Sequence, residues 1–378
     1  MSAGNAPARR AHRWLVPGLL IFATLLGFLS IMARWADQQA LDTNEWTDTS
    51  TELLENEEIR NTLAAYLVDQ LYANVDVAAE LREVLPPELK ALAGPASGGL
   101  REAADRIARR ALESPQVQTL WEQANRRAHR QFINVVDGGT GNVSTSGGDV
   151  TIDLQTLVAQ VAARVGLANL AGKIPPDAGQ LTVLQSDQLS AVQTGADLLD
   201  KGALAITILA LLLFALAVYL ARGRRREVLR GVSIAFIVAG LLALVVRAIA
   251  GNAVVDSLAS TASIEPVAQN IWDIGTALLS ETAWNAIING LLIMFVVLLA
   301  GPSRWARRLR SEAAPYMHER PGMTYAVVAA VFLLLVWWGP TPAFRSPGWL
   351  IVVAGLMALG TEALRRQTER EFPDAKLG

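Results

Sequence analysis

The chain has 378 residues, of which 52% are hydrophobic, and its mean hydropathy is +0.31. That hydrophobic share exceeds what a soluble domain needs and favours an integral membrane protein. Cysteine is absent, which excludes a disulfide framework, a thiolate metal site and a cysteine nucleophile. The formal net charge of −2 hides an uneven distribution of acidic and basic residues along the chain.

Six apolar stretches each approach the roughly 20 residues that a helix needs to cross a bilayer core. They lie near residues 14–33, 203–221, 231–250, 284–300, 323–338 and 348–363. The first stretch could instead be a cleaved secretory signal. Its apolar run is near full membrane length, however, and Met32-Ala33-Arg34-Trp35 offers no A-x-A-like cleavage site. An uncleaved anchor is therefore the better interpretation.

Arginines concentrate in alternate connections between these stretches. They precede the first stretch and follow the second, fourth and sixth, whereas residues 251–283 contain no Lys or Arg. Lys and Arg of short loops stay with the cytoplasm. We therefore predict a plasma membrane protein with a cytoplasmic N-terminus (1–13), a cytoplasmic tail (364–378) and residues 34–202 outside the cell.

Amphipathic patterns predict helices within the extracytoplasmic domain. Asn56 is a plausible N-cap before a helix whose apolar residues recur at every fourth position from Ile59 to Leu71. A second apolar stripe runs from Leu100 to Leu112. The dipeptide Ser114-Pro115 ends it and is typical of the N-cap and first position of a third helix.

Strand-like alternation appears further along the same domain. Residues 150–154 alternate after the Gly/Ser/Thr-rich segment 138–149 and predict a short strand, with which residues 181–184 could pair. A helix from about 154 to 166 is expected between them. Another helix is expected from about residue 187, and no strong breaker separates it from the second membrane span.

These patterns predict an all-α membrane protein with six transmembrane helices and an α-rich extracytoplasmic domain containing a small β-hairpin or short sheet. The anchor at 14–33 and the domain at 34–202 precede a five-helix bundle at 203–363, which carries an outer amphipathic segment at 251–283. Residues 265–283 either belong to the extracytoplasmic domain or lie on the membrane surface. The pattern leaves both arrangements open.

Charge is segregated along the chain. Residues 36–200 carry 24 acidic and 12 basic side chains, and the remainder carries 11 acidic and 21 basic ones. An acidic outer domain repels phosphate polymers, so nucleic acid is excluded as a partner. Orientation and anionic headgroups account for the inner arginines.

Within the domain, eight acidic residues lie between Asp37 and Glu58, and seven arginines lie in 101–130. The helices that carry them either face each other or present solvated faces. The alternative is that the acidic stretch concentrates cations or docks a basic partner.

The search for catalytic constellations is negative. His129 is the one histidine that the predicted topology puts outside, so no local histidine pair can hold a metal, and its arginine neighbours indicate a surface position. The sequence contains no H-E-x-x-H, Walker A or G-x-S-x-G motif. We therefore predict no catalytic residue, no metal and no cofactor.

Polar residues near the outer ends of the spans form the one candidate site. Arg247 lies close to the outer end of the third span, and Asn285 and Asn289 lie four residues apart on one face of the fourth. With Glu281 they could line a shallow polar cavity open to the outside. Interhelical hydrogen bonds and a snorkelling arginine are the alternative.

Several features carry a resemblance to a group of known proteins. They are the N-terminal anchor, Trp46, the helix start Asn56-Glu57-Glu58-Ile59, the segment Gly148-Asp149-Val150-Thr151-Ile152-Asp153-Leu154 and the arginine-flanked spans. In this layout the chain resembles uncharacterised integral membrane proteins of high-GC Gram-positive bacteria. The resemblance implies a membrane location and brings no activity, cofactor or site residue.

We therefore expect a multi-pass membrane protein of the bacterial cell envelope that acts through its extracytoplasmic domain in a non-enzymatic binding, scaffolding or sensing role. The expected partners are the lipid bilayer and an envelope protein or a second copy of the chain. A transporter or channel for a small solute is the alternative and would require a continuous polar path through the bundle. A membrane-bound extracytoplasmic hydrolase is the second alternative.

Overall fold

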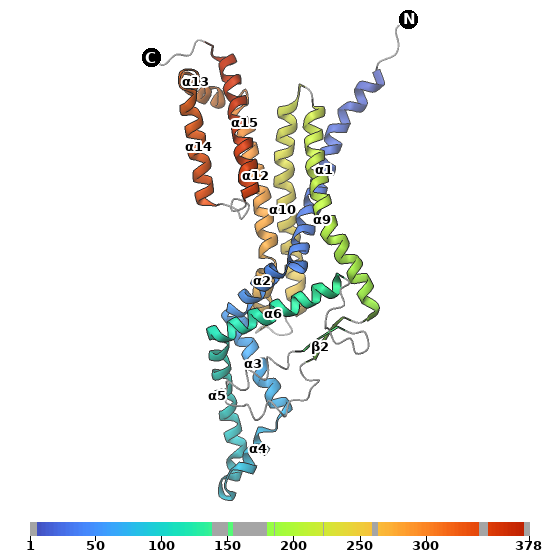
Figure 1. Cartoon of the computed structure of the whole chain (residues 1–378), viewed down its shortest axis with the longest axis vertical. Coiled ribbons are helices and arrows are strands. Elements are labelled where there is room, and N and C mark those ends of the chain that lie inside the picture. Colours follow the sequence, from blue (N-terminus) through green and yellow to red (C-terminus); the bar gives the residue numbers. More distant parts are fainter. Residues whose placement is uncertain are drawn as a thin grey trace. The chain divides into compact units, whose positions relative to one another are not determined.

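The chain is overwhelmingly helical in a computed structural model that describes residues 6–137, 150–153, 180–184, 186–221, 223–258, 264–339 and 347–373 (Figure 1). It divides into two units, each described here by itself. The bundle unit comprises Met1–Phe28, Ile208–Ala243 and Glu281–Gly378. The insert unit comprises Leu29–Thr207 and Leu244–Ser280, and so includes the predicted domain 34–202.

Each predicted span falls on a helix, to within one residue at its end. These helices are α1 (Ala6–Leu41), α9 (Ser186–Leu220), α10 (Arg225–Leu258), α12 (Ala277–Leu299), α14 (Pro321–Trp338) and α15 (Pro347–Glu371). The expected continuity of α9 from about residue 187 into the second span is confirmed. One further helix, α13 (Arg304–Glu319), separates α12 from α14.

Four of these helices are long and apolar enough to cross a membrane. The qualifying stretches are Trp14–Leu41, Val192–Leu220, Arg225–Leu258 and Ala277–Leu299. The helices α13 and α14 meet the same test only as a pair, across a bend of 119°, which would make a fifth span. Both numbers refer to the described part of the chain.

The apolar side chains of these helices remain largely uncovered by protein. Leu212 on α9 is 61% exposed, and Leu291 on α12 and Val245 on α10 are more than half exposed. Soluble proteins rarely leave such contiguous apolar surface in water, whereas a lipid bilayer solvates it without cost. The helices therefore belong to a membrane protein.

Small side chains let α1, α9 and α10 pack closely within the bundle unit. Ala23 of α1 meets Phe214 of α9 together with Val232 and Ala235 of α10 in one buried cluster. The ring of Phe214 lies 5.4 Å from that of Phe236, in a tilted arrangement. Helices in lipid associate through such close packing because apolar side chains gain nothing from leaving lipid.

The contact between α10 and α12 is closer still and has a reciprocal form. A Cβ atom added to Gly240 of α10 would lie 2.5 Å from the carbonyl oxygen of Ala283, on α12. One added to Gly290 of α12 would lie 2.8 Å from the carbonyl oxygen of Ser233, on α10. The two contacts are thus reciprocal. Each glycine faces a backbone carbonyl that lies seven residues before the glycine of the other helix.

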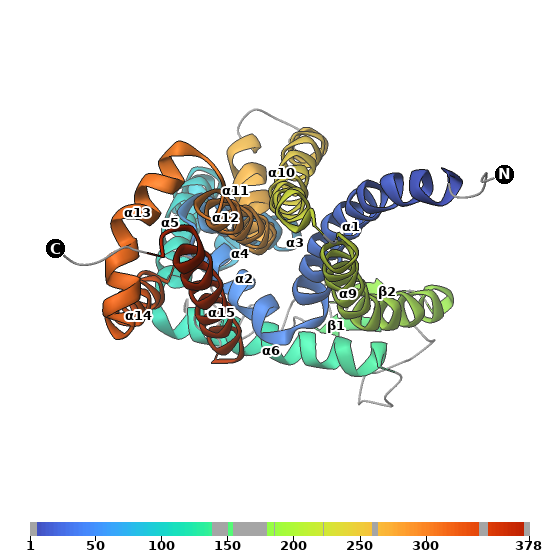
Figure 2. The ribbon, with the colours of Figure 1, turned by 90° about the horizontal axis from the view of Figure 1, so that it is seen from above.

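The three helices α13, α14 and α15 pack on one another and lie together at one side of the bundle unit (Figures 1 and 2). The Tyr325 hydroxyl of α14 donates a 2.8 Å hydrogen bond to Glu362 Oε2 of α15. Arg365 and Arg366 donate to the same carboxylate at 3.0 and 2.6 Å. Glu362 is thereby neutralised by two arginines of its own helix.

The insert unit is built mainly from short helices. They are α2 (Thr43–Glu55), α3 (Glu57–Asn74), α4 (Val77–Val84), η1 (Pro87–Leu92), α5 (Ala93–Glu113), α6 (Pro115–Val136) and α11 (Glu265–Gly275). Asn56 caps α3 as predicted, because its side chain accepts hydrogen bonds from the backbone N–H groups of Glu58 and Ile59. Ser114 likewise caps α6, with Pro115 in the first turn.

The core of this unit lies among α2, α3, α5 and α6. Each helix contributes one buried residue to a single cluster of Leu54, Ala64, Leu112 and Val117. The Trp121 indole N–H of α6 donates a 2.8 Å hydrogen bond to the Ser50 carbonyl of α2. The predicted stripes are buried only in part: Leu63 and Leu67 of α3 pack against this cluster and Leu112 of α5 belongs to it, whereas Leu100 and Ile107 are exposed.

Two short strands of the insert unit pair with each other. They are β1 (Val150–Asp153) and β2 (Gln180–Leu184), and they pair antiparallel with a register shift between Val150 and Thr151. The predicted loop 138–149 and helix 154–166 lie outside the described residues. The form of the connection between the strands therefore stays a prediction.

The segment predicted as one amphipathic helix over 265–283 is divided at Thr276, the C-cap of α11. The helix α11 packs against α2 and α3, and the Asn270 amide donates a hydrogen bond to Glu58. A Cβ added to Gly251 of α10 would lie 2.5 Å from the Trp272 indole nitrogen. Of the two arrangements left open by the sequence, α11 therefore follows the one in which it belongs with the domain helices.

The reciprocal glycine contact predicts unequal tolerance to a methyl group. Gly290→Ala should destabilise the protein by about 1–3 kcal/mol, because the new methyl must displace the backbone of α10. Gly355→Ala is the matched control, since a Cβ at that helical glycine meets no atom within 4 Å. Thermal unfolding in detergent measures both, and equal melting temperatures for the two variants would contradict the close contact.

Candidate functional site

The acidic and the arginine-rich stretches lie on helices that pack together, α2 on α6 and α3 on α5. Arg126 of α6 donates a 2.8 Å hydrogen bond to Asn44 Oδ1 of α2. Three ion pairs of the arginines in 101–130 involve acids outside the acidic stretch: Arg101 with Asp69, Arg109 with Asp105 and Arg126 with Glu122. The helices that carry the two stretches face each other, as one alternative expects.

His129 is buried, with only 5% of its surface exposed, so the prediction of a surface histidine was wrong. Its ring stacks on Trp46 with centroids 5.2 Å apart. The Nε2 atom lies 3.3 Å from the Ala40 carbonyl, which can only accept, so this nitrogen carries the hydrogen. The Nδ1 atom then accepts from the Thr43 hydroxyl at 3.0 Å.

The error arose because sequence neighbours on a helix point in different directions. The arginines at 126, 127 and 130 flank His129 in the chain, but a helix turns about 100° per residue, so they need not share its face. Phe132, one turn further on, lies beside the His129 ring with centroids 6.0 Å apart. Burial lowers the pKa of His129, although the Ala40 bond and the charge of Asp42 oppose the shift.

An open cavity of about 510 Å³ lies where α1, α6 and α9 meet within the insert unit. Its lining comprises Leu41, Ile133, Val136, Asp137, Gln193, Ala196, Asp197 and Asp200. The α9 residues recur at three- and four-residue steps and hence share one helix face. The Gln193 amide donates a 2.9 Å hydrogen bond to the Val135 carbonyl, which fastens α9 to the end of α6.

Three carboxylates give this acidic cavity a negative potential. Asp137 is the C-cap of α6, where the helix dipole already carries partial negative charge. Asp197 and Asp200 face the cavity from α9, and Lys201 pairs with Asp197. Such a site favours a positively charged group and disfavours an anion.

In the predicted outer cluster, Arg247 has two partners in the structure, and neither belongs to the cluster. Arg247 donates a 2.8 Å hydrogen bond to Thr276 Oγ1 and forms a 2.6 Å ion pair with Asp273. These partners join α10 to the end of α11 within the insert unit. Glu281, Asn285 and Asn289 lie on α12, in the bundle unit, so a cavity shared with Arg247 stays a prediction.

Sequence reasoning missed the partners of Arg247. Asp273 lies in the segment 251–283, which contains no Lys or Arg. A carboxylate in this segment, following a span that carries an arginine, was the signal that could have suggested the pair. The contact explains how an arginine is tolerated within the predicted third span, because its charge is paired and hydrogen-bonded. Its role in the structure is to hold α11 against α10.

Arg310 is a buried arginine among those assigned to orientation from the sequence, and its contacts give it a structural role as well. Only 2% of its surface is exposed. It forms a 2.8 Å ion pair with Glu371 of α15 and donates hydrogen bonds to the carbonyls of Leu299 and Gly301 at the end of α12. A cation at this position satisfies carbonyls that the helix end leaves unpaired.

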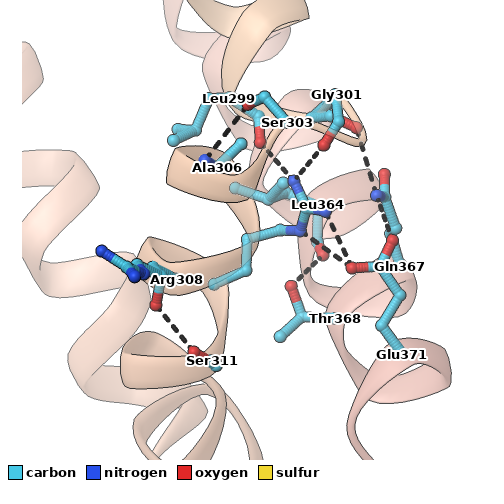
Figure 3. Close-up of polar contacts among 12 residues, drawn as sticks. Leu299, Gly301, Ser303, Ala306, Arg308, Ser311, Leu364, Gln367, Thr368 and Glu371 are labelled. Carbon is cyan, nitrogen blue, oxygen red and sulfur yellow. Dashed lines mark hydrogen bonds and ion pairs between the residues drawn. The ribbon is translucent and has the colours of Figure 1, made fainter.

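Polar side chains around Glu371 extend this contact (Figure 3). Gln367 donates to Glu371 Oε1 at 2.8 Å and to the Ala300 carbonyl at 3.2 Å. Arg226 of α10 donates in turn to Gln367 Oε1 at 2.6 Å. Burial disfavours the Glu371 carboxylate, but the hydrogen bonds from Gln367 and Arg310 outweigh it, so the pKa of Glu371 is lowered.

Searches with the whole chain found no matching family model, no matching curated protein and no matching solved structure. Among the described residues, no group of three or more His, Asp or Glu side chains is arranged to hold a metal ion. The fold and its apolar helices define the class, a helical membrane protein.

The buried histidine makes stability dependent on pH. The folded pKa lies below the ordinary value of about 6.5, so the unfolded state binds more protons, and stability present above that pH is lost on acidification. The melting temperature should therefore fall between about pH 7.5 and pH 5.5. His129→Gln should weaken this fall, whereas His12→Gln should leave it unchanged; a fall that persists in His129→Gln would contradict the assignment.

The buried ion pair predicts a large effect from a single charge. Arg310→Met should cost about 3–5 kcal/mol, because it removes the cation that pairs with Glu371 and the donor to two helix-end carbonyls. Arg308→Met removes the same charge from the same helix at an exposed position, so any effect on orientation would be shared. Abundance and melting temperature should drop for Arg310→Met alone, and a similar loss in both variants would point to orientation instead.

Proposed function

We propose that the chain is a six-span membrane protein of the bacterial cell envelope, with both termini cytoplasmic and residues 34–202 outside. The helix α14, with 18 residues, extends roughly 27 Å at 1.5 Å per residue, and α15 is longer. Both lengths suit a bilayer core. The arginines in the first turns of α1, after α9, after α12 and on α15 support this orientation.

We further propose that the protein binds a positively charged partner at the acidic cavity and performs no catalysis there. The observation that carries this is the convergence of Asp137, Asp197 and Asp200 on an open volume of about 510 Å³. Clefts of that size accommodate ligands or a few side chains. A basic segment of another envelope protein matches both the volume and the charge.

Hydrogen bonds between the helices that form the cavity walls also support a role in binding. The Gln193 hydrogen bond joins α9 to α6, and Thr207 of α9 shares a 2.6 Å hydrogen bond with Ser30 of α1. A site whose walls are already held in place loses less conformational entropy when a ligand binds. The cavity can therefore act in scaffolding or sensing without a large rearrangement.

The transporter alternative receives less support from the bundle. A transport path needs polar groups along the helix interfaces. The interface of α10 with α12 instead closes to backbone contact at Gly240 and Gly290. The interface of α10 with α1 and α9 is lined by alanine, valine and phenylalanine, such as Ala23 and Val232.

The hydrolase alternative is weakened by the surroundings of His129. A general base needs an accessible nitrogen within hydrogen-bond reach of its substrate. Here Nδ1 is bonded to Thr43, Nε2 is bonded to Ala40, and the ring lies against Trp46. Nδ1 therefore joins α6 to α2, and Nε2 joins α6 to the end of α1.

The acidic cavity predicts charge-selective binding. A fluorescent tetralysine peptide should bind the purified protein in nanodiscs of zwitterionic lipid, and the double variant Asp197→Asn, Asp200→Asn should bind it about tenfold more weakly. Each partly exposed charge contributes only modestly, which is why both are removed. Fluorescence anisotropy measures the dissociation constants.

A second double variant, Asp48→Asn with Glu52→Gln, is the matched control. It removes the same charge from α2 and leaves the cavity intact. An equal weakening in both double variants would place binding in the general field of the acidic domain. Weakening in the control alone would place it on the acidic stretch from Asp37 to Glu58 and overturn the cavity proposal.

A further inference from the structure

A second open volume, also of about 510 Å³, lies in the bundle unit among α9, α10 and α12. Its walls are almost wholly apolar and include Leu211, Phe214, Val218, Val232, Phe236 and Ile293. These residues come from the final part of α9, the first part of α10 and the final part of α12. All three parts lie towards the same end of the unit, where the arginine-rich turn between α9 and α10 is found.

The apolar groove has a polar end formed by two residues. Arg225, at the start of α10, and Tyr219, near the end of α9, both line it. Tyrosine is typical of the headgroup level of a bilayer, where its ring meets apolar chains and its hydroxyl meets water. The groove therefore runs from a hydrocarbon-like interior to a cationic rim.

The three consecutive arginines at this turn have different surroundings. Arg224 pairs with Glu227, and Arg226 donates to Gln367 of α15. Arg225 is the one that lines the groove, and its residue is exposed. Its guanidinium can present several N–H donors to a phosphate in a planar fork, which a lysine cannot do.

From this juxtaposition we infer that the groove binds an anionic glycerophospholipid, with an acyl chain along its apolar walls and the phosphate at Arg225. An apolar groove in a bilayer accepts acyl chains of any lipid, so selectivity must come from the rim. The charge of Arg225 favours a headgroup with net negative charge over a zwitterionic one. In the proposed orientation this lipid belongs to the cytoplasmic leaflet.

The absence of native cysteine makes the groove directly testable. Ala215 lines it and is exposed, so Ala215→Cys offers a single attachment point for a bimane fluorophore. The labelled protein is placed in nanodiscs with a small fraction of either phosphatidylglycerol or phosphatidylcholine carrying a nitroxide on the acyl chain. Quenching reports how often each lipid occupies the groove.

We expect the anionic lipid to quench with a relative association constant about fivefold above that of phosphatidylcholine. Arg225→Gln should bring the ratio close to unity. Arg230→Gln is the matched control, because it removes the same charge from an exposed position of α10 outside the groove lining, and it should keep the preference.

Three results would overturn the inference. They are equal quenching by the two lipids, a preference that survives Arg225→Gln, and an equal loss in both arginine variants, which would indicate a diffuse basic surface. Absence of quenching, together with disulfide formation on oxidation of the unlabelled Ala215→Cys protein, would show instead that a second copy covers the groove. Both leaflets of the nanodisc have the same composition, so the outcome does not depend on the proposed orientation or on the acidic cavity.

Discussion

The bundle depends on how closely α10 approaches α12. Apolar side chains are solvated by lipid, so burying them between helices supplies little driving force, and association relies on dispersion contacts that weaken steeply with distance. Gly240 and Gly290 remove the side chains that would hold the two backbones apart. The opposite face of α10 packs on Ala23 and Phe214, so this one helix holds three neighbours. Apolar side chains of α10 that no helix covers, such as Leu241 and Val245, are exposed and suit contact with lipid.

The insert unit follows the rules of a protein in water. Four helices each contribute to one apolar cluster, and two capping residues start α3 and α6. His129 is buried there as a neutral ring because it finds an acceptor in Ala40, a donor in Thr43 and a stacking partner in Trp46. A polar group in this position costs little once hydrogen-bonded, and it fixes how α6 lies on α2.

The features that were predicted correctly from sequence depend on neighbouring residues. Asn56 and Ser114 cap helices through bonds two or three residues away, and the spans are recognised by length and apolarity. The burial of His129 and Arg310 depends on residues about 60 to 90 positions away, which periodicity does not reveal. The acidic cavity was missed for the same reason, because its carboxylates come from α6 and α9, and only the fold brings them together.

The arginines illustrate why one explanation does not cover a whole class of residue. Their location in the chain supports the proposed orientation of the spans, and a charge acting in this way requires no particular contact. Yet Arg310 is buried against Glu371, Arg247 is paired with Asp273, and Arg225 lines a groove. A topology signal needs only a positive charge. An arginine whose guanidinium also forms specific hydrogen bonds or ion pairs therefore has a second role. Contact and burial distinguish that role.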